Sequence, residues 1–338
     1  MNETETEQIA LEPAHTLLEA PKKRVPFWVG IFILAILTLI FVSIAYLLRE
    51  IQTTKEVPVE QNIAVEIPSP YNDLSLEAKS IVVWDVANQK ILFAKNENDV
   101  LPLASLTKVM ATLVATDLIP GYTTIIIEKD FLNAEGDSGL LLNEKWSFKD
   151  LSKFSLTVSS NDGMRAIASV AGAVLSSTSG TDEYETGRNA FIARMNKKAE
   201  QLGLTTMSFK NETGLDVNEA LGGAHGSAYD MARLFEYTMS SYPDVIESTR
   251  EVSFKVSSLS KFSHNATNTN PYVSAIPGII ASKTGFTDLS GGNLVIAFNP
   301  ELKRPIIISV LGSSYEGRFT DTLKLVDATL DLIKREDR

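Results

Sequence analysis

The chain has 338 residues, a net charge of −11 at pH 7 and no cysteine. The negative charge argues against a nucleic-acid partner, because phosphate binding requires clustered lysine and arginine. The absence of cysteine excludes disulfides, thiolate catalysis and cysteine-ligated zinc. Since 44% of the residues are apolar, the chain can form one large domain or two small ones, together with additional segments.

A polar N-terminal stretch is followed by an uncharged apolar run. Residues 1–20 contain five glutamates and no lysine or arginine, which predicts a disordered tail. Residues 26–48 carry no charge, and at about 1.5 Å per residue they can cross a hydrocarbon core of roughly 30 Å. Trp28 and Tyr46 lie near the ends of this run, where interfacial aromatic residues belong. The run therefore predicts a transmembrane helix, with a cleaved signal peptide as the alternative.

The charges around the apolar run favour one orientation in the membrane. Three basic residues directly precede it and two follow it, so the positive-inside rule predicts that the tail, residues 1–25, is cytoplasmic. Residues 49–72 contain three prolines and no clear period, which predicts a linker that lifts a domain off the bilayer. Residues 73–338 would form that domain, outside the cytoplasm.

Strand-like runs lie at both ends of the segment 73–338, and helical patterns lie between them. The expected strands are 81–86, 90–94, 278–283, 293–298 and 305–311. Apolar residues at helical spacing predict a helix over 105–117 and a last amphipathic helix that carries apolar residues from 323 to 333. This order predicts one sheet built from both chain ends, with a helical subdomain inserted in the middle.

Ser105 and Lys108 form a Ser-x-x-Lys motif at the start of the helix 105–117. Positions i and i+3 share a helix face, so the lysine can reach the serine hydroxyl. Serine becomes a good nucleophile when a base takes its proton, and lysine can be that base if burial or a second cation lowers its pKa. The pair alone is a weak signal, because Ser258 and Lys261 repeat it in a polar, serine-rich stretch.

Two further motifs follow in the chain. Ser159-Ser160-Asn161 could bridge the lysine and a substrate amide through its hydroxyl and amide groups, although a helix N-cap or turn is the structural alternative. Lys283-Thr284-Gly285 ends an apolar run, which places it on a strand. Its lysine and threonine suit an anionic substrate end, and its glycine allows a close approach to the backbone. The three motifs in this order are typical of class A β-lactamases and penicillin-binding proteins.

With these motifs the chain resembles the serine-type D-Ala-D-Ala carboxypeptidases, the low-molecular-weight penicillin-binding proteins, over about residues 74–335. The matching segments are 101–110, 138–162, 209–215, 283–292 and Glu316-Gly317-Arg318. The resemblance implies an α/β (α+β) fold of the serine β-lactamase/DD-peptidase type. Its antiparallel sheet would be built from both chain ends, with an inserted helical subdomain.

The resemblance also implies a role for each matching residue. Ser105 would attack the carbonyl between two D-alanines and form an acyl-enzyme, with Lys108 as the general base. Ser159 and Asn161 would relay protons and hold the peptide, and Lys283 would stabilise anionic charge and lower the pKa of the other lysine. The substrate-binding residues would be Thr284, Gly285, Phe286, Thr287 and Arg318, with the backbone N–H groups of Ser105 and Phe286 as the oxyanion hole.

The expected substrate is a peptidoglycan stem peptide, and β-lactams are expected covalent inhibitors. The resemblance implies neither a metal nor an organic cofactor. Members of the family usually carry a signal peptide, a second β-rich domain and a C-terminal amphipathic anchor. Here the N-terminal span is expected to replace that anchor, which would make the protein a single-pass protein of the cell membrane with an extracytoplasmic catalytic domain.

Several alternatives use similar residues. Class A β-lactamases deacylate rapidly through a Glu-x-x-Leu-Asn motif, and neither Glu200 nor Glu212 is followed by Leu-Asn. A DD-endopeptidase of peptidoglycan cross-links would use the same site. An inactive peptidoglycan-binding protein would be favoured by a broken motif, and all three motifs are intact. His225 and His264 are expected to be solvated or simple hydrogen-bond partners rather than members of a catalytic triad.

Overall fold

A computed structural model of the chain describes residues 26–52, 68–176 and 183–336. The chain divides into two units, Met1–Glu66 and Ile67–Arg338. The first unit contains the helix α1 (Phe27–Gln52), whose segment Phe27–Arg49 has a mean hydropathy of 2.9 and is long and apolar enough to cross a membrane. The predicted tail, residues 1–25, lies outside the described residues.

The boundaries of the predicted linker differ from those of the structure. Residues 49–52 continue α1, and residues 53–67 lie outside the described residues. Tyr71 is buried in the second unit, where its ring stacks on Phe93 and its hydroxyl hydrogen-bonds Thr329 (2.9 Å). The apolar surface of this tyrosine explains why the chain joins the folded unit before residue 73.

The second unit contains a five-stranded antiparallel sheet built from both ends of its sequence, as predicted. The strand order is β10-β11-β12-β1-β2. The bounds are β1 (Ser80–Asp85), β2 (Lys90–Lys95), β10 (Ile279–Thr287), β11 (Gly291–Phe298) and β12 (Ile306–Ser313). β1 joins the two ends by pairing with both β2 and β12. β10 runs beyond the predicted end at residue 283, so the whole Lys283-Thr284-Gly285 motif lies on this edge strand.

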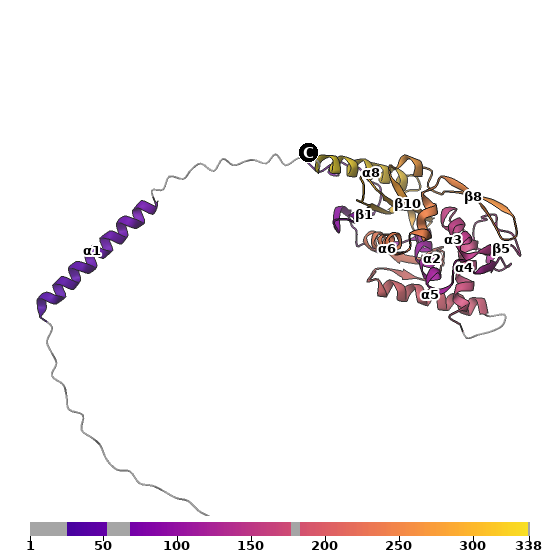
Figure 1. Cartoon of the computed structure of the whole chain (residues 1–338), viewed down its shortest axis with the longest axis horizontal. Helices are drawn as coiled ribbons and strands as arrows, with labels where there is room; N and C mark the ends of the chain where they lie inside the picture. Colours follow the sequence, from indigo (N-terminus) through magenta and orange to yellow (C-terminus); the bar gives the residue numbers. More distant parts are fainter. Residues whose placement is uncertain (1–25, 53–67, 177–182, 337–338) are drawn as a thin grey trace, which may run out of the picture. The chain divides into compact units, whose positions relative to one another are not determined.

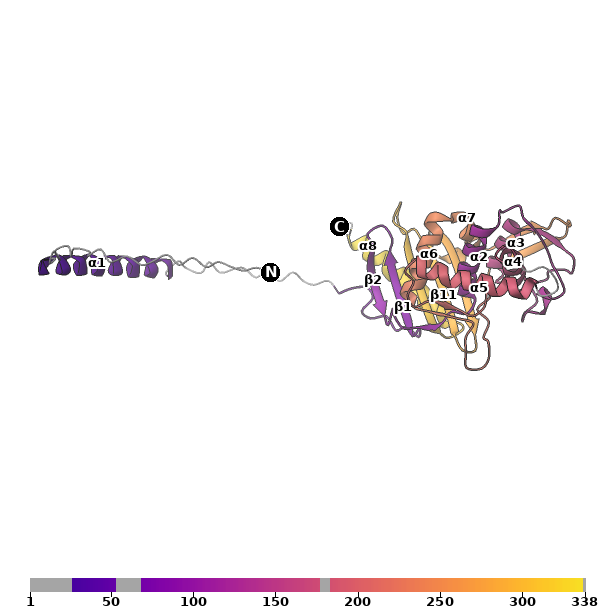
Figure 2. The same cartoon turned by 90° about the horizontal axis from the view of Figure 1, so that it is seen from below.

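Both faces of the sheet are buried. On one face, Ile81 and Val83 of β1 belong to an apolar cluster with Leu325 of α8 (Gly317–Glu336). On the other face, Val82 and Trp84 belong to the main core with the helices. Figures 1 and 2 show α8 and the helical region on opposite sides of the strands. Because β1 is buried on both faces, it reads as a continuous apolar run rather than as an alternating one.

The helical subdomain lies between β2 and β10 in the chain, as predicted. Its α-helices are α2 (Thr107–Leu118), α3 (Phe148–Thr157), α4 (Asn161–Ala173), α5 (Glu183–Gln201), α6 (Ala228–Ser241) and α7 (Pro243–Ile246). Its 3-10 turns are η1 (Ala104–Leu106), η2 (Phe131–Asn133), η3 (Glu247–Arg250) and η4 (Val273–Ala275). Its short strands are β3 (Leu101–Pro102), β4 (Thr124–Ile126), β5 (Lys145–Ser147), β6 (Ser208–Phe209), β7 (Ala224–Gly226), β8 (Ser253–Ser257) and β9 (Ser263–Thr267).

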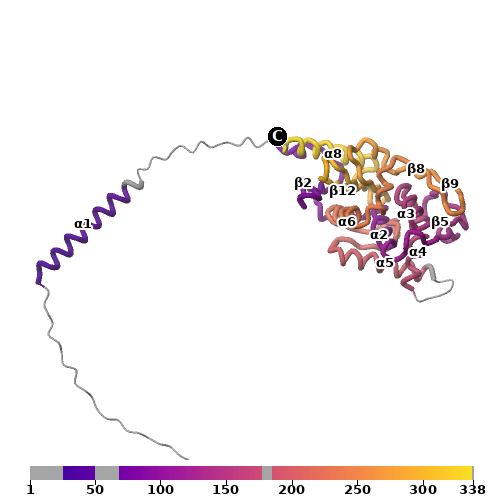
Figure 3. The backbone as a smooth tube through the Cα atoms, in the orientation of Figure 1, coloured from indigo at the N-terminus to yellow at the C-terminus, as the bar shows by residue number. Residues whose placement is uncertain are grey.

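α4 and α5 pack side by side through small residues (Figure 3). A Cβ atom on Gly172 of α4 would lie 2.1 Å from the carbonyl oxygen of Gly187 in α5. Only glycine permits this approach, because any larger residue would force the helices apart. The close contact fixes α4, the helix that begins with the second motif.

Candidate active site

Ser105 lies in the 3-10 turn η1, directly before α2. The residue before it, Ala104, has a φ of +48°, and its carbonyl accepts a hydrogen bond from the hydroxyl of Thr107 (2.6 Å). Lys108 is buried one turn after Ser105, and its Nζ donates a hydrogen bond to Ser105 Oγ (2.7 Å). The structure therefore places the two residues of the first motif in direct contact, as their spacing predicts.

The surroundings of Lys108 disfavour its charged form. Burial lowers the pKa of Lys108 well below its usual value, the positive charge of Lys283 lowers it further, and Glu212 acts in the opposite direction. A second hydrogen bond from Nζ to the Thr213 carbonyl (2.8 Å) fixes the position of the amine. A lowered pKa favours the neutral amine, which can accept a proton from the serine hydroxyl.

The N-cap interpretation of the second motif holds for Ser160, and the hydroxyl of Ser159 contacts Lys283 of the third motif. Ser160 is the N-cap of α4, because its Oγ accepts the N–H of Gly163 (2.9 Å). Ser159 has a φ of +61°, and its Oγ accepts a hydrogen bond from Lys283 Nζ (3.0 Å). Asn161 donates its Nδ2 to the Glu135 carbonyl (2.7 Å), and its buried Oδ1 has no hydrogen-bond partner among the described residues. That oxygen can accept a hydrogen bond from a ligand.

The third motif lies beside the first motif in space. Lys283 is buried, and burial together with the charge of Arg318 lowers its pKa to about 7. A Cβ atom on Gly285 would lie 2.9 Å from the Leu103 carbonyl oxygen and 3.3 Å from the Ser105 nitrogen. Glycine at this position therefore lets the edge strand β10 approach the turn that carries Ser105.

Arg318 lies in the first turn of α8 and is buried beside β10. Its Nη1 donates to the Gly285 carbonyl (2.8 Å), and its guanidinium lies over the rings of Tyr315 (4.3 Å) and Phe319 (4.6 Å). The predicted hydroxyl ligands for a carboxylate have protein partners in the structure. Thr287 Oγ1 donates to Asp216 (3.0 Å), and Thr284 Oγ1 shares a hydrogen bond with Thr269 Oγ1 (2.6 Å).

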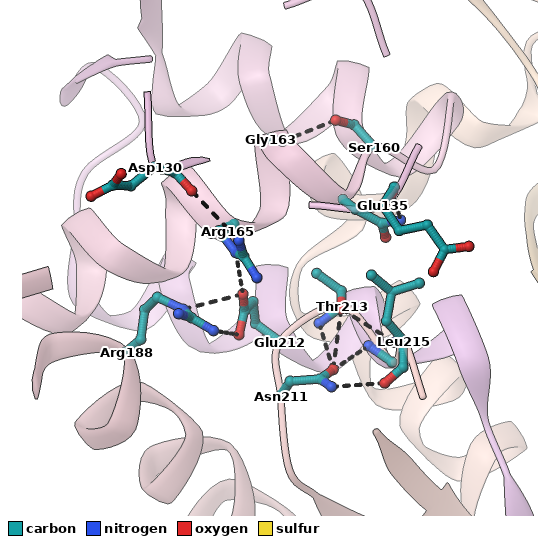
Figure 4. A network of polar contacts seen from close by, with 12 residues as sticks. Asp130, Glu135, Ser160, Gly163, Arg165, Arg188, Asn211, Glu212, Thr213 and Leu215 are labelled. Atoms are coloured by element: carbon teal, nitrogen blue, oxygen red, sulfur yellow. Dashed lines mark hydrogen bonds and ion pairs between the residues drawn. The ribbon is translucent and has the colours of Figure 1, made fainter. Parts of the chain in front are cut away.

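The segment 209–215 matches the family by resemblance, and the sequence assigns it no role. Asn211 Oδ1 accepts the N–H groups of Thr213 (3.2 Å) and Gly214 (2.7 Å), and its Nδ2 donates to the Leu215 carbonyl (2.8 Å) (Figure 4). These bonds present the Thr213 carbonyl to Lys108. The Asn-x-x-Gly spacing was the available signal, because asparagine organises turns and glycine allows a positive φ.

Gly214 packs closely against the turn that carries Ser105, and its replacement should be costly. Its φ is +81°, and a Cβ atom there would lie 1.8 Å from the Ala104 carbonyl oxygen. We expect Gly214→Ala to lower the free energy of unfolding by about 3 kcal/mol and to slow acylation of Ser105 by penicillin. Urea denaturation and stopped-flow acylation measure the two effects.

Gly203 provides the matched control, since its φ is +69° and a Cβ atom there would meet nothing within 4 Å. Gly203→Ala should cost only the backbone strain of about 1 kcal/mol and leave acylation unchanged. Equal losses of stability in the two variants would contradict the proposed collision.

Two hollows flank the motifs. One of about 330 Å³ is lined by residues around 136–138 and by Ser159, Ser160 and Asn161. The other, of about 380 Å³, is lined by Glu135, by Leu215 and Asp216, and by residues 286–289 at the end of β10. The first hollow therefore lies beside the second motif, and the second hollow lies beside the end of β10.

The remaining candidates have structural partners. His264 shares a hydrogen bond with Glu144 (2.7 Å) and packs against Trp146, as expected for a hydrogen-bond partner. Ser258 and Lys261 form the turn between β8 and β9, in which the Lys261 N–H donates to the Ser258 carbonyl (2.9 Å). Within the described ranges, no group of three or more His, Asp or Glu residues is arranged to hold a metal ion.

Residues 64–314 match the family model described as D-alanyl-D-alanine carboxypeptidase, peptidase family S11. The chain belongs to this family. Members with similar sequences include D-alanyl-D-alanine carboxypeptidase DacF of Bacillus subtilis, which is 29% identical over 271 residues. That alignment covers 76% of this chain and 63% of DacF, so the chain spans less than two thirds of the length of that relative.

Two other similar proteins extend the comparison. A D-alanyl-D-alanine endopeptidase of Haemophilus influenzae is 27% identical over 251 residues, which are 72% of this chain and 79% of that protein. The crystal structure of penicillin-binding protein D2 from Listeria monocytogenes, in the ampicillin-bound form, superposes with a TM-score of 0.62 and 26% identity. It covers 76% of this chain and 98% of that one. The protein described here therefore has the DD-peptidase fold that its motifs predict.

Proposed function

We propose that the protein is a serine DD-carboxypeptidase that removes the terminal D-alanine from peptidoglycan stem pentapeptides. The observation that carries the proposal is the contact of Lys108 Nζ with Ser105 Oγ (2.7 Å), at a lysine whose pKa is lowered by burial and by Lys283. Membership of the D-alanyl-D-alanine carboxypeptidase family supports the same substrate class.

Acylation begins when neutral Lys108 takes the proton of Ser105 as Oγ attacks the carbonyl carbon of the penultimate D-alanine. The backbone N–H groups of Ser105 and Phe286 stabilise the negative charge that develops on the carbonyl oxygen. The C–N bond then breaks, and the amine of the leaving D-alanine receives the proton, with Ser159 as the relay. Water hydrolyses the resulting ester, regenerates Ser105 and releases the shortened peptide.

The edge strand β10 and the residues beside it provide the proposed substrate-binding site. The protonated forms of the buried Lys283 and Arg318 attract the terminal carboxylate, and the hydroxyls of Thr284 and Thr287 would turn toward it from their present partners. The Oδ1 of Asn161 accepts an N–H group of the peptide, since it has no other partner among the described residues. Because the Listeria relative is an ampicillin-bound penicillin-binding protein, we include β-lactams as covalent inhibitors of Ser105.

The helix α1 is proposed as a membrane anchor. Its length and hydropathy are sufficient to cross a bilayer, and the distribution of basic residues supports an outer position for the catalytic domain, residues 73–338. Such a single-pass protein of the cell membrane would have its active site facing the cell wall.

The second candidate is a DD-endopeptidase, because D-alanyl-D-alanine endopeptidases are among the similar proteins. The two activities are separated by supplying a stem pentapeptide and a cross-linked peptide dimer in parallel and measuring free D-alanine and monomer. The proposal predicts D-alanine release from the pentapeptide. Cleavage of the dimer without any release of D-alanine would establish the endopeptidase instead.

A further inference from the structure

A buried ion cluster lies beside the segment that holds Lys108. Glu212 is 1% exposed, and its carboxylate contacts Arg188 through Nε (3.3 Å) and Nη2 (3.4 Å) and Arg165 through Nε (3.8 Å) (Figure 4). Arg165 comes from α4 and Arg188 from α5, and both side chains are 26% exposed. A carboxylate this deeply buried requires such partners, since an unpaired buried charge is strongly destabilising.

The cluster is joined to the catalytic lysine through the backbone. Glu212 directly precedes Thr213, whose carbonyl accepts the hydrogen bond from Lys108 Nζ (2.8 Å). On its other side, Asn211 holds the turn through the N–H groups of Thr213 and Gly214. The Glu212 side chain therefore ties this turn to α4 and α5, whose own contact is fixed by the close approach of their glycines.

We propose that Glu212 is a positioning residue for acylation, which holds the Thr213 carbonyl on Lys108 and supplies the negative charge that balances the cations around that lysine. The inference rests on the proposed function, because it concerns the step in which Lys108 takes the Ser105 proton. Neither the three motifs nor the role of Lys283 requires this cluster.

The charges around Lys108 determine in which direction each variant should change the pKa of this lysine. Lys283 of β10 lowers the pKa of Lys108, and Glu212 raises it. Arg165 and Arg188 face Glu212, so removal of either one leaves more of its negative charge acting on the lysine. Arg318 of α8 acts on Lys283.

One further acid lies beside the cluster. Burial raises the pKa of Asp162 on α4 to about 6, with Asp137 adding to the rise and Arg165 opposing it. Asp162 titrates in the wild type and in every variant that keeps Arg165. Its titration therefore cannot move the pH profiles of acylation of two such variants in opposite directions.

The test is the pH profile of the acylation rate constant with a chromogenic cephalosporin, measured on the full chain in detergent. Lys108 acts as a base only when neutral, so the rate rises with pH through its pKa. Glu212→Gln removes the negative charge and should move this acid limb to lower pH by about one unit. Arg188→Gln uncovers the charge of Glu212 and should move the limb to higher pH.

Glu144→Gln provides the matched control. Glu144 is also a carboxylate that is 1% exposed, but it hydrogen-bonds His264 and the N–H of Leu141, and it has no place in the proposed machinery. This variant should lose thermal stability and keep the wild-type pH limb. Glu212→Asp, which restores the charge, should return the limb toward the wild-type position even if the maximal rate stays lower.

The role of Glu212 would be overturned if the acid limb of the pH profile stayed at its wild-type position in Glu212→Gln and Arg188→Gln. It would also be overturned if the limb moved in the same direction in both variants. Either result would leave the proposed function intact. A failure of the wild-type protein to acylate at any pH would overturn the proposed function and this inference together. A structural role alone would change the melting temperatures of the variants without separating the two limbs in opposite directions.

Discussion

Replacement of Ser105 by alanine should lower D-alanine release by at least about 10⁴-fold and abolish covalent labelling by a fluorescent penicillin. Alanine has no oxygen with which to form the ester. The fold should be retained, because the Ser105 hydroxyl is partly exposed and its contact is with Lys108. The two readouts are a coupled assay of free D-alanine and in-gel fluorescence.

The second Ser-x-x-Lys sequence provides the control for this experiment. Ser258→Ala changes the same atoms in the turn between β8 and β9, so its D-alanine release and labelling should match the wild type. Labelling of Ser105→Ala at the wild-type level would show that another residue is the nucleophile.

Replacement of Lys108 by arginine should lower the acylation rate by about 10²- to 10⁴-fold, the usual contribution of a general base. Arginine stays protonated, so it has no free lone pair with which to accept the serine proton. In the wild type, burial and the charge of Lys283 lower the pKa of Lys108, so acylation should rise with pH and level off as the amine becomes neutral. The arginine variant should show no such titration.

Lys261→Arg is the matched control for charge and size, and it should acylate at the wild-type rate. A melting temperature measured for each variant separates loss of catalysis from loss of the fold, because Lys108 is buried. An arginine variant that folds and acylates with the wild-type pH profile would exclude Lys108 as the base.

The sheet could be predicted from the sequence because its strands carry strong local patterns. The apolar run around Ile81 and Val83 and its turn predict the hairpin β1–β2, and three similar runs predict β10 to β12. The short strands were missed. β3 and β6 have only two residues each, and so few residues show no period.

The spatial neighbours in the site could be predicted only in part. The spacing of Ser105 and Lys108 predicts their contact because one helical turn separates them. The contact of Ser159 with Lys283 joins positions 124 residues apart, whereas the sequence predicts that Ser159 bridges Lys108. Spacing along the chain does not determine which lysine a distant loop meets. The partnership of Thr287 with Asp216 and the cluster around Glu212 had no local signal, because they depend on how separate loops and helices meet.

The structure contains a second serine–lysine contact within the site, which makes the identity of the nucleophile the central question. Ser159 accepts a hydrogen bond from Lys283 (3.0 Å), and the pKa of that lysine is lowered to about 7. Ser105 and Ser159 therefore each have a hydrogen bond with a buried lysine, and a second feature has to distinguish them. The first pair is distinguished by its position in the tight turn beside Gly285, where backbone N–H groups can stabilise an oxyanion.

Peptide mapping by mass spectrometry of the wild-type protein after incubation with penicillin tests this assignment most directly. The account predicts one penicilloyl group, carried by the peptide that contains Ser105. A group on the peptide that contains Ser159, or a wild-type protein without any adduct, would contradict it.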